Sequence, residues 1–280
     1  MSTLLHMARW AHSVSIADVP PALRERLRLQ AASTLAAAAA GVHSEDAQIA
    51  LTVARRMGAG SHRIAPGVDG LTMEGALFAG ASLSMAHDYD DWMLCAHPSH
   101  SAVWAAWVGA AELGLGWDAA LRAQIVANEI LARLGGYCLP GRQNGQSWSF
   151  LHGVGGALVG GLLRGHSPEQ LASGMALTLA QASHVDWRLF SGPGKTLMAA
   201  RPLLDGWRVA ELVEEGVTGP VGLLDEDSEF TSVFAGGRPV RGWFSGLPVE
   251  DPSGTAWLTW SLTVKCVPGC DYLTAAVEAT

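Results

Sequence analysis

The segment AHDYDDWMLCAHPSH, residues 86–100, contains three carboxylates within four positions, Asp88, Asp90 and Asp91. Their mutual repulsion should raise the pKa of at least one of them, and such a group suits proton transfer. On a helix, Asp88 and Asp91 would share a face and Asp90 would point elsewhere. The plainer interpretation is a solvated acidic helix end that meets His97 or an arginine.

Two histidines, His97 and His100, flank Pro98-Ser99 in the same segment. A histidine with an acid partner is a credible general acid or base near neutral pH. Two histidines and several carboxylates also form a metal-binding set, and a helix-capping or core histidine is the structural alternative. The segment predicts acid/base chemistry and leaves both alternatives open.

Outward from this segment, the sequence predicts helices separated by glycine or proline. We expect one helix that starts after Pro20-Pro21 and runs through LRERLRLQAASTLAAAAA to Gly41, with proline at its start and glycine at its end. Ser167-Pro168-Glu169-Gln170 is a capping box that should open a second helix, and a third is expected at about Met198–Val213. GVGGALVGGLLRG, residues 153–165, predicts a buried central helix, because only close packing offsets so many glycines.

The sequence changes in character after Gly219-Pro220. Residues 221–256 lack helical periodicity, and WLTWSLTV, residues 257–264, alternates in a way that predicts a strand. We therefore expect a mainly α protein, with an all-α domain at 1–220 and an irregular segment with a strand at 221–280.

Composition limits the classes of function. Of 280 residues, 49% are hydrophobic, which allows a large buried core, and the net charge of −8 predicts no affinity for nucleic acid or an anionic membrane. No run reaches the roughly 18 apolar residues that span a bilayer, and no signal peptide is recognisable. With only four cysteines, we expect a reduced, cytoplasmic protein.

Five blocks of sequence carry a family resemblance when they are taken in order. They are DVPPALRERLRLQAASTLAAAAAG; GALFAGASLSMAHDYDD followed by His97-Pro98; LVGGLLRGHSPEQLASGMALTLAQAS; Lys195 followed by Gly206, Gly216 and Thr218-Gly219-Pro220; and KCVPGC at 265–270. Together they resemble the MmgE/PrpD superfamily, which includes 2-methylcitrate dehydratase, cis-aconitate decarboxylase and iminodisuccinate epimerase. The resemblance implies a helical body followed by an α+β lid domain, a homodimer, and neither cofactor nor metal.

The resemblance also implies an acid/base site beside a substrate carboxylate. It assigns catalytic roles to Asp88, His97 and Lys195, and Lys265 matches a further lysine of the family. In the glycine-rich helix the family's histidine has no direct match: Gln146 falls near its position, and His152 lies about one and a half turns further on. The candidates from all these considerations are, for catalysis, Asp88, His97, Lys195 and His152, and, for substrate binding, Asp91, Trp92, His100, Gln146, Trp148 and Lys265.

Each candidate has a structural alternative. Lys195 stands on a predicted turn into a helix, where it would bind a carboxylate or act as a base in an enclosed site, or would otherwise be solvated. His152 among glycines also fits a satisfied core histidine. Lys265 would be exposed if no lid follows.

Several positions depart from the family. Trp92 stands where it has a threonine, Met198 and Thr274 stand where it often has histidines, and the gap before His97 is one residue shorter. Trp92 predicts a smaller or more apolar pocket.

The sequence therefore predicts a lyase or isomerase that acts on a small molecule by dehydration, decarboxylation or epimerisation. One alternative is a repurposed enzyme that cyclises or isomerises a larger apolar substrate, of polyketide or terpenoid type. Another is a non-catalytic, truncated helical protein that joins a partner.

Overall fold

The computed structural model describes residues 2–142, 149–183, 185–225, 227–248, 256–270, 276–277 and 279. Helices dominate these residues, so the expectation of a mainly α protein is confirmed. The α-helices are α1 (Thr3–Ser13), α2 (Pro21–Gly41), α3 (Glu45–Arg56), α4 (Met73–Met85), α5 (Ser99–Glu112), α6 (Trp117–Tyr137), α7 (Phe150–Arg164), α8 (Pro168–Ala180), α9 (Leu197–Glu214) and α10 (Glu229–Phe234). The shorter elements are the strands β1 (Ala59–His62), β2 (Asp91–Trp92) and β3 (Thr263–Val264) and the 3-10 turns η1 (Ile16–Asp18), η3 (Trp187–Ser191), η4 (Pro193–Thr196), η5 (Arg241–Phe244) and η7 (Leu258–Ser261).

Local sequence explains where several helices begin. Helix α8 starts at the predicted capping box, in which the Gln170 amide N–H donates to Ser167 Oγ and the Gln170 side chain accepts the Ser167 N–H. Side-chain oxygens satisfy backbone N–H groups in the same way at the start of α1, α3 and α4. Helix α2 runs from Pro21 to Gly41, so the helix expected after Pro20-Pro21 begins at the second of these prolines. These helix predictions are confirmed.

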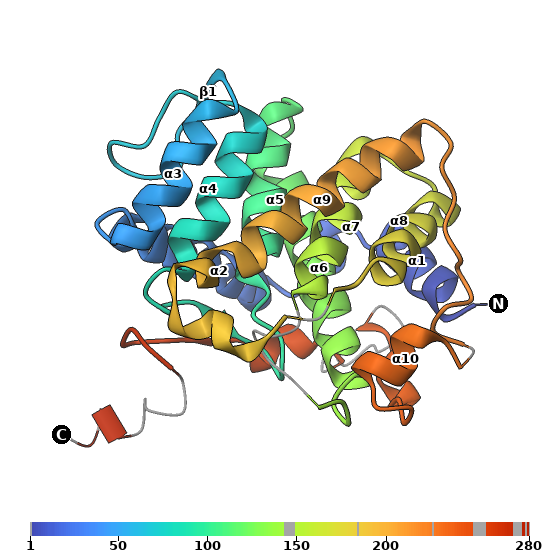
Figure 1. Ribbon diagram of the computed structural model, residues 1–280. Helices are drawn as coiled ribbons and strands as arrows, with labels where there is room; N and C mark the ends of the chain where they lie inside the picture. Colours follow the sequence, from blue (N-terminus) through green and yellow to red (C-terminus); the bar gives the residue numbers. More distant parts are fainter. Residues whose placement is uncertain are drawn as a thin grey trace.

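Helix α7 packs against α5, α6, α8 and α9, and α9 crosses directly over it (Figure 1). Its glycines bring the two backbones into contact. A Cβ atom on Gly206 would stand 2.0 Å from the carbonyl oxygen of Gly153, and one on Gly156 would stand 2.3 Å from that of Leu203. The prediction of a buried central helix is confirmed, and the close approach is the reason why glycine occupies these positions.

The C-terminal segment, defined as residues 256–270, differs from the prediction. The strand expected over 257–264 is wrong for most of its length, because η7 occupies Leu258–Ser261 and only Thr263 and Val264 form β3. The carboxylate of Glu129, on α6, accepts the backbone N–H groups of Leu258 and Thr259, which favours a turn over an extended chain. Strand β3 then pairs antiparallel with β2.

Residues beyond 220 share the core of the helical body. Leu224, Phe230, Phe234 and Trp257 belong to the same buried apolar cluster as residues of α1, α6 and α7. The division into domains at residue 220 stays a prediction.

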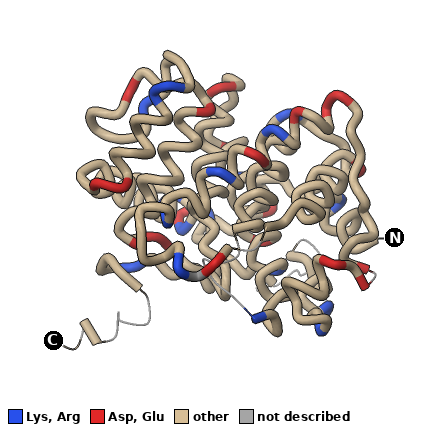
Figure 2. Tube along the Cα trace, in the orientation of Figure 1, with Lys and Arg blue, Asp and Glu red and all other residues tan. Residues whose placement is uncertain are grey.

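Charged residues are spread over the outer helices and loops (Figure 2), and the central helix α7 carries a single one, Arg164. Within the described parts of the chain, no helix is both long and apolar enough to span a membrane.

Candidate functional site

The acidic run does not continue a helix. Helix α4 ends at Met85, Asp88 adopts a left-handed backbone conformation with φ of 53°, and Asp91 lies in β2. The expectation that Asp88 and Asp91 share a helical face is therefore wrong. Pairing with β3 extends the chain at Asp91, and a positive φ at a residue other than glycine costs free energy that the surroundings must offset.

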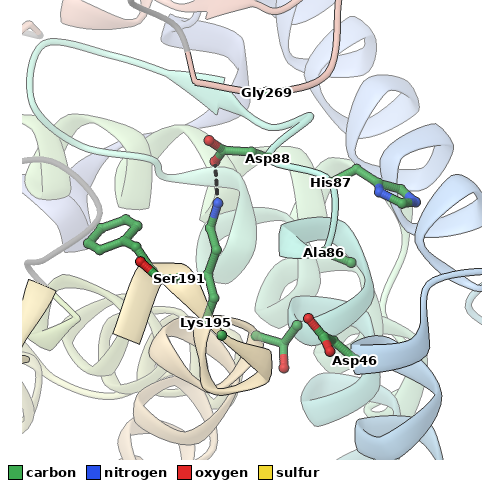
Figure 3. A pocket seen from close by; sticks show the side chains of 10 residues that line it. Asp46, Ala86, His87, Asp88, Ser191, Lys195 and Gly269 are labelled. Atoms are coloured by element: carbon green, nitrogen blue, oxygen red, sulfur yellow. Dashed lines mark ion pairs between the residues drawn. The ribbon is translucent and has the colours of Figure 1, made fainter. Parts of the chain in front are cut away.

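Asp88 and Lys195 meet in a cavity of about 410 Å³. Lys195 Nζ lies 3.1 Å from Asp88 Oδ1, and the two side chains are 16% and 17% exposed. Figure 3 shows Lys195 rising from η4 toward the Asp88 carboxylate, while His87 points away from the pair. The described residues that line the cavity are Asp46, Ala86, His87, Asp88, Phe190, Ser191, Gly192, Lys195, Thr196 and Gly269. The sequence named both members of this ion pair, and the fold brings them together.

Lys265, a substrate-binding candidate, is buried, so the alternative of an exposed lysine does not hold. Its ammonium donates to Asp90 Oδ1 at 2.7 Å, to the carbonyl oxygen of Asp88 at 2.9 Å and to that of Gly269 at 3.2 Å. Its side chain is only 1% exposed. The physical reason is the β2–β3 pairing, which carries the C-terminal segment across the acidic run.

Asp90 is the residue that the sequence interpretation left out of the site. Its second carboxylate oxygen accepts hydrogen bonds from His97 Nδ1 at 2.5 Å and from His100 Nε2 at 3.1 Å. Burial by itself raises the pKa of Asp90, but His97 and His100 outweigh burial and hold the pKa well below its usual range. Asp90 is therefore an ionised carboxylate that lies between the Lys265 ammonium and the two imidazole rings. The run of three acids in the sequence could have identified Asp90. The assumption that the run is helical placed its side chain on another face from Asp88 and Asp91, and so outside the site.

His97 and His100 occupy the far side of Asp90 from Lys265. Burial lowers the pKa of His97, but the Asp90 carboxylate more than compensates and raises it. His100, fully buried on α5, hydrogen-bonds through Nδ1 to Ser84 Oγ at 2.9 Å. Neither histidine is among the described residues that line the cavity. Asp90 and Lys265 connect them to Asp88, since Asp90 accepts from both histidines and from Lys265, which in turn donates to the Asp88 carbonyl oxygen.

Asp91, a substrate-binding candidate, faces the protein interior. One of its oxygens accepts the N–H of Ser99, the first residue of α5, and the other accepts the side-chain amide of Gln30. It thus supplies a negative charge at a helix N-terminus that has no side-chain cap of its own. Burial raises its pKa, and the Asp90 charge adds to the effect. The raised pKa expected within the acidic run is confirmed, with burial as its main cause.

His152 is 3% exposed on α7, where Nδ1 hydrogen-bonds to Ser101 Oγ at 3.2 Å. Its ring meets that of His100 edge-on, with centroids 5.7 Å apart. Burial and the nearby His100 lower its pKa well below the usual value. Its surroundings match the core-histidine alternative.

The remaining binding candidates lie elsewhere. Trp92 is half-buried in β2 and is not among the described lining residues of the cavity. Gln146 and Trp148 fall outside the described residues. In the part of the chain that the structure describes, no three or more His, Cys, Asp or Glu side chains are grouped to hold a metal ion.

Comparison with known proteins adds one finding. The family profile described as the MmgE/PrpD N-terminal domain matches residues 5–242, and so covers most of α1, all of α2 to α10 and the whole acidic run. No curated protein matches the chain.

Proposed function

The chain belongs to the MmgE/PrpD family, and from this membership we propose that it is a lyase or isomerase that moves a proton next to a substrate carboxylate. The family is enzymatic, with dehydratases or lyases among its members. The observation that supports the proposal is the Asp88–Lys195 ion pair on the wall of a cavity large enough for a small molecule.

In this proposal Lys195 is the cation of the site. A substrate carboxylate bound at its ammonium is stabilised there as negative charge develops during loss of the α-proton. Lys195 enters from a turn that leads into α9, so its backbone is held by a rigid helix while its side chain reaches into the cavity.

Asp88 is the proposed base. Its carboxylate takes the proton from the carbon next to the substrate carboxylate, and the C–H electron pair moves into that carboxylate as the proton leaves. Delivery of a proton from water to the other face, with release of the Asp88 proton to solvent, gives epimerisation; departure of a group from the neighbouring carbon with the proton held by Asp88 gives a lyase reaction. The left-handed backbone at Asp88 agrees with such a role, since strained residues gather at active sites.

A deuterium-exchange assay tests the proposal. The purified chain is incubated in D2O with a panel of small mono-, di- and tricarboxylates, and ¹H NMR follows loss of the α-proton and any product. Asp88→Asn and Lys195→Met should each lower the rate by about 100-fold or more, the scale of positioned acid/base catalysis.

Arg201→Met is the matched control. Arg201 lies on α9, the helix that follows Lys195 in the chain. Its side chain is 81% exposed and pairs with Asp205 on the same helix. It should exchange like the wild type. A wild type that exchanges no member of the panel, or a folded Lys195→Met variant with the wild-type rate, would contradict the proposal.

The apolar-substrate alternative receives little support from the cavity. Ala86 and Phe190 are the apolar side chains among its described lining, and Trp92 is absent from that lining. A non-catalytic role is excluded by any turnover in the same assay. The homodimer stays a prediction that sedimentation equilibrium tests directly.

A further inference from the structure

We propose that Asp90 is a positioning residue. Its carboxylate lies between Lys265 and His97 and holds both side chains, an arrangement that we call the clamp, and the C-terminal segment thereby contributes to the site. Asp90 does not line the cavity, so it acts through other residues. The inference rests on the proposed function only in taking Asp88 and Lys195 as the reacting pair.

The two carboxylate oxygens of Asp90 have different hydrogen-bond partners. Oδ1 accepts the Lys265 ammonium at 2.7 Å, and Oδ2 accepts His97 and His100 at 2.5 and 3.1 Å. The Asp90 side chain is fully buried. A buried carboxylate between donors on both sides leaves each donor little freedom, because any other arrangement would leave charge unpaired.

The Lys265 side of the clamp reaches the backbone of Asp88. Lys265 Nζ donates to the Asp88 carbonyl oxygen at 2.9 Å and lies 3.7 Å from Asp88 Oδ1. The N–H of Gly269 donates to the same carbonyl oxygen at 3.3 Å. These contacts hold the left-handed backbone that aims the Asp88 carboxylate at Lys195. Asp90 therefore positions the proposed base, Asp88, through Lys265.

The His97 side provides a signature that does not depend on turnover. The charged and titratable groups that face His97 are Asp90 and Asp91, Lys265 on the C-terminal segment, and His100 and His152 on α5 and α7. Burial lowers the pKa of His97; Asp90 raises it most among these groups, and Lys265 lowers it. Removal of the Asp90 charge should therefore lower the pKa of His97, and removal of the Lys265 charge should raise it. Loss of packing alone would not produce opposite signs.

The test is an NMR titration of the His97 imidazole, assigned with a His97→Gln variant, in the full chain. In Asp90→Asn the pKa of His97 should fall, and in Lys265→Met it should rise. Asp90→Asn should also lower the maximal α-proton exchange rate by about tenfold or more while KM changes by less than about threefold, because Lys195 remains to bind the substrate.

Tyr89→Phe is the control. It removes the hydrogen bond from Tyr89 Oη to the carbonyl oxygen of Cys266, so it loosens the same two segments without touching the clamp. Its His97 titration should match the wild type.

The outcomes separate the two proposals. If the wild type exchanges substrate and a folded Asp90→Asn variant keeps both the wild-type titration and the wild-type rate, the clamp is refuted and the proposed function stands. If the wild type exchanges nothing, the proposed function fails, and the His97 titration alone decides whether the clamp exists. Should Asp90→Asn not fold, Lys265→Met decides, since an unchanged or lowered His97 pKa there overturns the inference.

Discussion

The α7–α9 contact and the C-terminal segment are held in place by opposite means. Between α7 and α9 the backbones touch, and glycine provides the space. The C-terminal segment instead lies against α6 and the acidic run through hydrogen bonds and ion pairs, from Glu129, Arg133 and Asp90. The first contact depends on the close fit of two backbones, whereas the second combines the apolar packing of Trp257 with charged and polar contacts.

The difference teaches which part of the molecule the site depends on. The α7–α9 contact contains no titratable group at its closest points, and ion pairs of Arg164 with Glu211 and Glu214 join the two helices only at the last residue of α7. The C-terminal segment brings Lys265 and Gly269 to Asp88, so the contacts that retain this segment also shape the cavity. Substitutions in the two regions should therefore have different signatures.

The largest effect is expected where shape alone decides. Gly206→Ala should lower the free energy of unfolding by about 4 kcal/mol, because the new methyl group meets the backbone of Gly153, which cannot move aside without separating the helices. Urea unfolding followed by circular dichroism measures the change. Gly174→Ala, on α8, is the control: its Cβ would meet only Ala157 at 3.7 Å, so stability should stay the same or rise. Equal losses in both variants would remove the role given to backbone contact.

An intermediate effect is expected where charge holds the segment. Glu129 accepts three hydrogen bonds from Leu258 and Thr259 and pairs with Arg133 at 3.5 Å, with both charged side chains buried. Glu129→Gln replaces one acceptor oxygen with a donor and leaves Arg133 without its counter-charge. We expect a loss of about 2 kcal/mol. Hydrogen exchange should show Leu258 and Thr259 opening before the helices unfold.

Glu25→Gln serves as the control for that substitution. Glu25 pairs with Arg28 on the surface of α2, where the two side chains are 74% and 51% exposed. Its loss should change stability by less than about 0.5 kcal/mol. If Glu129→Gln opens the whole protein and the C-terminal segment together, the two regions are not separable in the way proposed.

The smallest effect concerns pH. The pKa of His97 in the folded chain is raised by Asp90, so its contribution to stability is complete below the pKa of an unfolded histidine, about 6.5. That contribution is lost as the pH rises through the folded pKa. The stability difference between the wild type and His97→Gln should therefore shrink above neutral pH, as measured by urea unfolding at a series of pH values. In an Asp90→Asn background this loss of stability above neutral pH should disappear, because burial and Lys265 then lower the pKa of His97, and a persistent slope of the same sign would point to another partner.

Much of the fold followed from local signals. Proline and a capping box mark the starts of α2 and α8, and the glycine-rich run marks α7, because these features act within a few residues. The strand at 257–264 failed because Glu129 lies far away in the sequence and diverts the chain into a turn. Alternation of residue types cannot report a partner on another helix.

Within the acidic run, the sequence determined which side chains carry chemistry, and the tertiary structure decided what each one does. Asp88, Asp90 and Asp91 are adjacent in the chain, yet Asp88 meets Lys195, Asp90 meets Lys265, and Asp91 serves the start of α5. The partners lie far along the chain, and Asp90 and Lys265 are 175 positions apart. Helix caps and turns form from neighbours, whereas ion pairs across such separations form only when the packing of whole helices brings them together.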